Sequence, residues 1–435
     1  MISTTINRII AFIRSLESRI AFYPVTFGLA SFIISVTILA YEDNGLTSWI
    51  EDAVPQLIIR QEDTARSVLN SLLGAMISML VFTFSMVMLL LSQAANNYSP
   101  RVLPGLISNK RHQVVLGIFV ASIVYCLLTI ISIDSNKEGK YLLPSFSILL
   151  AIVITIIALG AFVYFIHSIS QEIQITNMLA GIYNKTKIRL EYLIDEEQQS
   201  KEVELTSTYL SHNQHAKSTG YIQSFTEGRL TDYLKEHKLV VSMCVYKGEY
   251  VHRDSLLFRS SRVLTEDEEK YIHSCINYGR EELVHRNYVL GFKEITEVGV
   301  RAMSPGVNDP GTAINTINLI SNLFAIRLRK SDNSILPDDA GNALLILQTI
   351  NFDDLLYYVV ACYRQYSKQD IVVMHKLTMM LNYLHTEARN TEHQKSITKN
   401  LDLVMDDARR SIQNEYDLKR LEQAAAFTLT SSLHS

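Results

Sequence analysis

Residues 67–100 read SVLNSLLGAMISMLVFTFSMVMLLLSQAANNYSP and contain no Asp, Glu, Lys, Arg or His over 34 positions. A helix needs about 20 apolar residues to cross a bilayer, so this stretch predicts a membrane-spanning helix over about 67–95. A serine recurs in it at every seventh position, and a helix places such positions on one face. The four serines are Ser71, Ser78, Ser85 and Ser92. The stretch therefore predicts a membrane protein with a hydroxyl-bearing face on one of its spans.

Three further apolar runs flank this stretch and predict spans over about 21–41, 113–133 and 141–167. The first run is longer than the apolar core of a signal peptide, which favours a retained membrane helix. Residues 21–171 are therefore predicted to form a four-helix transmembrane domain.

Basic residues gather in the N-terminal segment, residues 1–20, and between the second and third spans. They are Arg8, Arg14, Arg19, Arg101, Lys110 and Arg111. Loops rich in Lys and Arg stay on the cytoplasmic side of a membrane. This distribution predicts a multi-pass protein with both termini in the cytoplasm.

The composition of the 435 residues agrees with a partly membrane-embedded chain. Charged residues make up 19%, the formal net charge is −4, and the mean hydropathy is positive. A chain without basic character is not expected to bind nucleic acid. The four cysteines have no zinc-like spacing, and no disulfide framework, metal site or cofactor is expected.

The chain after residue 171 is long enough to bury a core of its own. We expect a juxtamembrane helix and polar linker over 172–219, a small α+β region over 220–303 and a helical region over 304–435. Residues 239–246 and 249–251 predict a strand, a turn and a strand. Thr265 and Glu268 predict a capping box. Apolar spacing predicts further helices over 353–366, 370–386 and 398–425. The fold class is an α-helical integral membrane protein with a mostly helical α+β cytoplasmic C-terminal domain.

Three stretches together resemble one family. They are AMISMLVFTFSMVMLLLSQAANNYSPRVL with RHQVVLGIFVASIVYCLL (75–103 and 111–128), FIHSI (165–169) and RAMSPGVNDPGTAI (301–314). In these the chain is similar to the bacterial predicted membrane proteins grouped as domain of unknown function 2254. The resemblance implies a bacterial inner-membrane protein with an N-terminal helix bundle and a cytoplasmic C-terminal part. It implies no reaction and no substrate.

The serine face has two interpretations. Small residues at regular spacing let helices approach closely and exchange hydrogen bonds, which is ordinary membrane packing. A polar face can instead line a water-filled pore between several subunits. The sequence leaves both open.

The motif at 301–314 also has two interpretations. Pro305 and Gly306 predict the end of one helix, and Asp309 before Pro310 predicts the N-cap and first residue of the next. The free N–H groups of that helix could instead hold an anion with help from Arg301. The candidate residues of this motif are Arg301, Ser304, Asn308, Asp309 and Thr312.

Other candidate sites are weaker. His167 ends the fourth predicted span, where an interfacial role is expected. Glu282 with His285, and His212 with His215, have only part of a metal-binding pattern. The sequence contains no phosphate-binding loop, nucleophile elbow or zinc-protease motif, so no enzyme is expected.

These observations favour a homo-oligomeric channel or pore, with a cytoplasmic part that assembles or gates it and a small ion or solute as cargo. The alternative is a membrane-anchored scaffold or sensor without transport activity. A secondary transporter is disfavoured, because the four predicted spans lack ionisable residues near their centres.

Overall fold

The chain forms two units, residues 1–177 and 178–435, which are described separately. The computed structural model describes residues 21–41, 58–59, 61–97, 110–134, 144–172, 174–199, 210–279, 287–338 and 342–431. These residues form thirteen helices and eight strands, with four long apolar helices near the N-terminus and all strands in the second unit. The basic residues of segment 1–20, and Arg101, lie outside the described residues.

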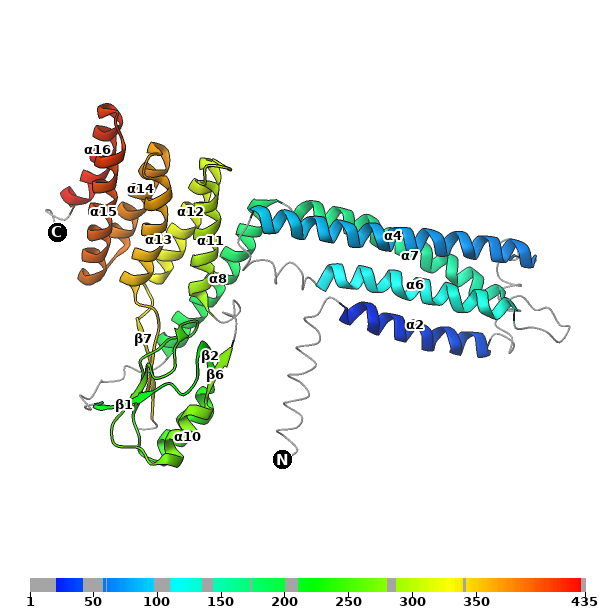
Figure 1. Cartoon of the computed structure of the whole chain (residues 1–435), viewed down its shortest axis with the longest axis horizontal. Coiled ribbons are helices and arrows are strands. Elements are labelled where there is room, and N and C mark those ends of the chain that lie inside the picture. The colour runs from blue at the N-terminus through cyan, green and yellow to red at the C-terminus, as the bar shows by residue number, and fades with distance from the viewer. Residues whose placement is uncertain are drawn as a thin grey trace. The chain divides into compact units, whose positions relative to one another are not determined.

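The first unit is a bundle of four helices (Figure 1): α2 (Phe22–Tyr41), α4 (Glu62–Asn97), α6 (Lys110–Asp134) and α7 (Ser145–Glu172). Each is long and apolar enough to cross a membrane, with mean hydropathies of 1.9, 2.2, 2.8 and 2.9. The four predicted spans are therefore present as helices, and α4 and α6 begin several residues earlier than predicted. The predicted spans began after the last charged residue or histidine, whereas the helices include Glu62, Asp63, Lys110 and Arg111 in their first turns.

Helix α6 holds this bundle together, because α2, α4 and α7 all pack on it. Its approach to α2 is close: a Cβ at Gly117 would lie 2.8 Å from the ring of Phe27, and one at Gly28 would lie 3.1 Å from Val120. Ser31 adds a hydrogen bond from its Oγ to the carbonyl of Ala121 across the same contact, at 2.7 Å. Small residues thus set the spacing of α2 and α6, as is usual where apolar helices pack.

The second unit contains α8 (Ile175–Gln199), apart from the first residues of this helix, and two sheets. One sheet has the strand order β1-β5-β3-β8-β7 and the other β4-β2-β6. The strands are β1 (His212–His215), β2 (Gly220–Phe225), β3 (Val241–Met243), β4 (Tyr250–Val251), β5 (Leu256–Ser260), β6 (Ile276–Gly279), β7 (Asn333–Pro337) and β8 (Ala343–Gln348). Helices α9 (Glu227–Glu236) and α10 (Glu266–Ser274) accompany them, and their apolar side chains share one core with both sheets.

Three predictions for this region differ from the structure. The strands predicted on either side of Lys247 and Gly248 do not pair with each other, because β3 lies between β5 and β8 whereas β4 pairs with β2. The five-stranded sheet also takes β7 and β8 from beyond residue 303, so it crosses the boundary predicted there. Its β8 (ALLILQ) is a short apolar run parallel to β3, and such a run does not reveal its partner by periodicity. The polar linker predicted up to residue 219 includes the end of α8 and the strand β1.

The remaining helices form three hairpins stacked in two layers (Figure 1). Helices α11 (Tyr288–Ala302), α13 (Phe352–Ser367) and α15 (Thr391–Ser411) are neighbours in one layer. Helices α12 (Pro310–Arg327), α14 (Ile371–Glu387) and α16 (Glu415–Ser431) are neighbours in the other. The helix predicted over 398–425 is two helices, because the side chain of Asn414 accepts a hydrogen bond from the N–H of Tyr416 and begins α16. Stacked hairpins bury a continuous core between successive pairs.

Candidate functional site

The serine face of α4 points away from the other helices of its bundle. Ser71, Ser78, Ser85 and Ser92 are all exposed. The first three donate their hydroxyl hydrogen to the carbonyl four residues earlier, at 2.8–2.9 Å. The side of α4 that is buried in the bundle carries a different set of side chains, namely Leu69, Met76, Thr83, Val87 and Leu90. The serines are therefore not part of the core of this bundle.

Apolar side chains share the serine face. Phe82 is 46% exposed and Leu89 is 50% exposed. Ala75 is exposed, and a Cβ added at Gly74 would meet nothing within 4 Å. The face is thus a smooth small-residue surface near Gly74 and becomes bulkier further along the helix. Packing among the described helices of the bundle does not account for the serines of this face.

The motif at 301–314 forms the turn between α11 and α12. Asn308 adopts a φ of 47°, and the N–H of Asp309 bonds the carbonyl of Ala302 at 2.8 Å, which ends α11. Asp309 is the N-cap of α12, as predicted: its carboxylate accepts hydrogen bonds from the N–H and the hydroxyl of Thr312, at 3.1 and 2.6 Å. These bonds hold the pKa of Asp309 below its usual value.

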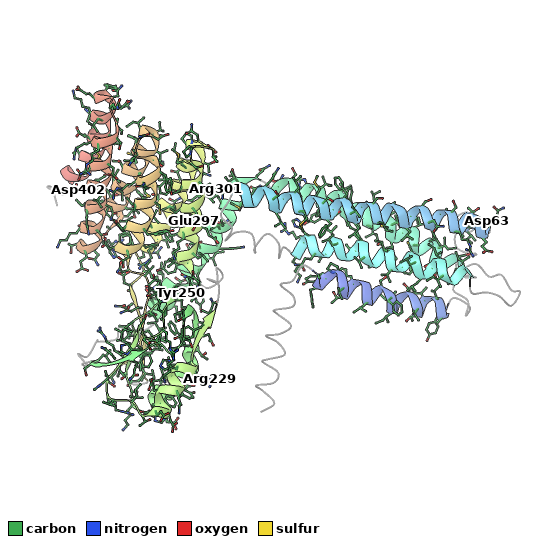
Figure 2. The ribbon with its side chains drawn as sticks, in the orientation of Figure 1. Asp63, Arg229, Tyr250, Glu297, Arg301 and Asp402 are labelled. Carbon is green, nitrogen blue, oxygen red and sulfur yellow. The ribbon has the colours of Figure 1, made fainter. Side chains whose placement is uncertain are left out.

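The geometry of this cap favours the structural interpretation of the motif. The carboxylate of Asp309 occupies the position that an anion would need at the start of α12. Arg301 is half-buried in the last turn of α11, one turn after Glu297 (Figure 2), and neither side chain is without a partner. Ser304 supplies its carbonyl to the N–H groups of Val307 and Asn308 at 3.0 Å. The structural role of the motif is thus the reversal of the chain between two packed helices.

The histidine chosen from the sequence is not the buried one. His167 is exposed on α7, whereas His112 and Gln113 are buried at the start of α6. The ring of His112 lies 5.4 Å from that of Phe165, and the amide of Gln113 has no hydrogen-bond partner among the described residues. The predicted span began at Gln113, so it left His112 outside and assigned no role to Gln113.

No group of His, Cys, Asp and Glu able to hold a metal ion occurs within the described ranges. His212 and His215 lie on β1, opposite Ser260 and Leu256 of β5. Glu282 and His285 fall outside the part of the chain that the structure describes.

The second unit contains a cavity of about 370 Å³ that the sequence did not reveal. It is bounded by α8, both sheets, the start of α11 and the segment after α12. Four aromatic side chains line it: Tyr192, Phe225, Tyr246 and Tyr288. Three cations and three carboxylates also line it: Arg189, Lys247, Lys330, Glu196, Glu197 and Glu227. Such a mixture of apolar wall and converging polar groups is typical of a small-molecule site.

Two of the three cations have carboxylate partners. Lys247 Nζ lies 2.6 Å from Glu227 Oε1. Lys330 pairs with Glu197 of α8, and its burial lowers the pKa of the ammonium against the opposing effect of that carboxylate. Arg189 differs: its Nε is buried without a hydrogen-bond partner among the described residues, and its guanidinium carbon lies 5.1 Å from the centre of the Tyr192 ring.

The comparisons with known proteins agree with the presence of long apolar helices. The model of a family described as predicted membrane protein, domain of unknown function 2254, matches residues 17–383. The chain belongs to this family. Uncharacterised proteins of Mycobacterium tuberculosis and Mycobacterium bovis are 23% identical to it over 380 residues, which is 83% of this chain and 71% of each relative. No solved structure matches.

In this family member a buried arginine, Arg327, bonds to Tyr288 in the wall of the cavity. Arg327 is fully buried at the end of α12. Its Nε donates to Tyr288 Oη at 3.0 Å, and its other nitrogens donate to the carbonyls of Lys330 and Ile350, at 2.8 and 2.9 Å, and to Asp332. Sequence reasoning missed this cluster because its members are far apart in the chain. A cationic residue ending an otherwise apolar helix, at 323–327 (LFAIR), is the signal that could have indicated it.

Proposed function

We propose that this protein is a homo-oligomeric, channel-like protein of the bacterial inner membrane, in which α4 helices of several copies surround a path for a small ion or solute. In this proposal the lipid bilayer covers the other helices and both termini lie in the cytoplasm. The second unit assembles or gates the oligomer. The proposal assigns no catalytic reaction, no cofactor and no nucleic-acid partner.

The outward serine face of α4 carries the proposal. From Ser71 to Ser92 the face is about 32 Å long at 1.5 Å per residue, which matches the roughly 30 Å hydrocarbon core of a bilayer. A seven-residue repeat stays on one side of a helix when helices wrap around each other with a left-handed twist. Copies of α4 in such a ring would present their serines to the same axis along the height of the membrane.

The hydroxyl geometry is compatible with a wet surface. A serine that donates to its own helix carbonyl keeps oxygen lone pairs that accept a hydrogen bond from water or from a partner helix. The same internal bond also lowers the cost of placing a serine against lipid. The environment of the face therefore has to be measured directly.

A membrane-anchored sensor is the second candidate, and the cavity in the second unit favours it. Helix α8 contributes Arg189, Tyr192 and Glu197 to the cavity. This helix begins only three residues after the end of α7, the last of the four apolar helices. A change in α8 on ligand binding would thus have a short covalent path to the bundle.

The test replaces Ser78 and Ser85 together by Leu in the full chain. A matched control replaces Thr26 and Thr37 of α2 by Leu. The hydroxyls of these two threonines are exposed and also donate to carbonyls four residues earlier, at 3.0 and 2.8 Å. Subunit number is measured by native mass spectrometry in detergent, and ion flux is measured in proteoliposomes. For a pore, the serine variant keeps the oligomer and loses flux, because a hydrophobic ring expels water. The threonine variant changes neither quantity.

Two other outcomes reject the pore. If the serine variant dissociates while the threonine variant does not, the face is a packing interface between copies. If the wild-type chain is a monomer without flux, the face meets lipid and the sensor candidate remains. Cysteines placed at positions 78 and 85 add an independent measurement, since a membrane-impermeant thiol reagent modifies them only in contact with water. The four native cysteines are removed first.

A further inference from the structure

We infer that the cavity of the second unit binds a small organic anion, in which a carboxylate or phosphate group meets Arg189 and an apolar or aromatic body lies against the surrounding tyrosines and Phe225. The inference concerns residues of this unit alone. It does not depend on whether α4 lines a pore.

The unmatched guanidinium is the first reason. Lys247 and Lys330 are neutralised by Glu227 and Glu197. Arg189 is partly exposed, but its Nε is buried without an acceptor among the described residues. Leaving a buried donor unsatisfied costs about 1–3 kcal/mol, and more for a charged group. A guanidinium binds carboxylate and phosphate groups through two parallel hydrogen bonds, so an anionic group is the ligand that would remove this cost.

The start of α11 forms a fixed part of the cavity wall, and its first N–H groups are already capped by Asn287. Asn287, Tyr288 and Val289 line the cavity, and they are the N-cap and the first two residues of a helix of 15 residues. Asn287 uses its side chain to cap Val289 at 3.0 Å and to donate to the carbonyl of Lys247 at 2.8 Å. The helix end is therefore held rigidly at the cavity wall.

The size and lining indicate the rest of the ligand. A volume of about 370 Å³ lies at the lower end of the range of small-molecule sites. Tyr192, Phe225 and Tyr288 offer ring surfaces, and Leu193, Leu336 and Ile350 add aliphatic surface. A bare inorganic ion would leave most of this surface uncovered. The lining therefore fits an anion attached to a ring or a short hydrocarbon.

A cation is a poorer fit. Glu197 accepts from both Lys330 Nζ and the N–H of Ser331, the latter at 3.0 Å. Glu227 accepts from Lys247. Glu196 also has a partner. No carboxylate of the lining is thus available to a positive ligand without breaking an existing contact.

The experiment uses the full chain in detergent at low salt, with isothermal titration of phenyl phosphate, benzoate and the uncharged benzyl alcohol. The variants are Arg189→Gln, Arg189→Lys and, as a control on the same helix, Lys185→Gln, an exposed side chain that does not line the cavity. We expect at least one of the two anions to bind once per chain. We expect its affinity to fall at least about tenfold in Arg189→Gln, by less in Arg189→Lys and not at all in Lys185→Gln.

Three results would overturn the inference: neither anion binds at concentrations up to about 10 mM, Arg189→Gln binds as well as Lys185→Gln, or benzyl alcohol binds as tightly as the anions. Tighter binding of phenyl phosphate assigns the anionic group as a phosphate, and tighter binding of benzoate assigns it as a carboxylate. If Arg189→Gln fails to fold, hydrogen exchange of the wild-type chain with and without the anion tests the inference instead. Slower exchange in residues 186–197 and 287–292 on addition of the anion supports the inference, and unchanged exchange there rejects it.

Discussion

Replacement of Arg327 by Met tests whether the buried arginine cluster holds the second unit together. Arg327 is 0% exposed and connects the end of α12 to Tyr288 of α11, to Asp332 before β7 and to Ile350 before α13. Asp332 in turn accepts from the N–H of Phe352 at 3.2 Å. The cluster therefore joins four segments that are far apart in the sequence.

The magnitude follows from what the substitution leaves behind. Methionine fills much of the volume but donates no hydrogen bond, so the carbonyls of Lys330 and Ile350 and the hydroxyl of Tyr288 lose a partner. Asp332 is 37% exposed and can recover water on one side. Removing one partner of a buried ion pair costs about 3–5 kcal/mol. We expect a loss of this size in the free energy of opening of α12 and α13.

Hydrogen exchange with mass spectrometry on the solubilised chain measures this opening. A loss of about 3–5 kcal/mol corresponds to exchange that is faster by roughly two to three and a half orders of magnitude. Arg364→Met is the matched control, since Arg364 pairs with Asp407 at 2.8 Å between α13 and α15 but is partly exposed. It should cost less, because Arg364 bonds one carboxylate whereas Arg327 bonds four groups. Equal effects of the two substitutions, or a loss below about 1 kcal/mol for Arg327→Met, would refute this reasoning.

Three further predictions concern the same unit. Gly299→Ala should cost about 1–3 kcal/mol, because a Cβ there would overlap the hydroxyl of Tyr363. Hydrogen exchange of α11 and α13 measures this loss, and a neutral result would show that α13 can move away from α11. Asp309→Ala should cost about 0.5–2 kcal/mol in α12 by the same measurement, whereas Asp309→Asn should cost less. Equal losses in the two variants would show that capping is not the main role of the carboxylate. Glu268 has its pKa lowered to about 2 by its hydrogen bonds with Arg262 and the N–H of Thr265. Its contribution to stability is complete above the unfolded pKa near 4.3 and is lost as the pH falls toward 2, so the thermal midpoint of Glu268→Gln should depend less on pH over that window than that of the wild type.

Local features of the fold could be predicted from local sequence. The capping box of α10 is present in full, with Glu268 N–H donating to Thr265 Oγ1 at 3.3 Å and Thr265 N–H donating to Glu268 at 2.9 Å. The cap of α12 at Asp309 is present as well. Both depend on residues three positions apart, so the chain carries the information within a single turn.

Features that depend on distant partners could not be predicted. The pairing of β3 with β8 joins segments about a hundred residues apart, and the sequence of Val241–Met243 does not indicate with which strand it pairs. The cavity is of the same kind, since Arg189 becomes unmatched only because α8 packs beside the start of α11 and the lysines near it find other carboxylates. The outward direction of Ser78 and Ser85 also required the structure, since α4 has apolar residues on every side.

The sequence by itself determined where the apolar helices lie, where several helices begin and which family the chain resembles. It could do so because hydrophobic length, charge and capping act over one or two helical turns. The tertiary structure decided how the strands are ordered, which charges are paired and which face of α4 is left uncovered by its own bundle. Those outcomes depend on which surfaces meet, and the free energy of each contact is set jointly by residues that the chain keeps far apart.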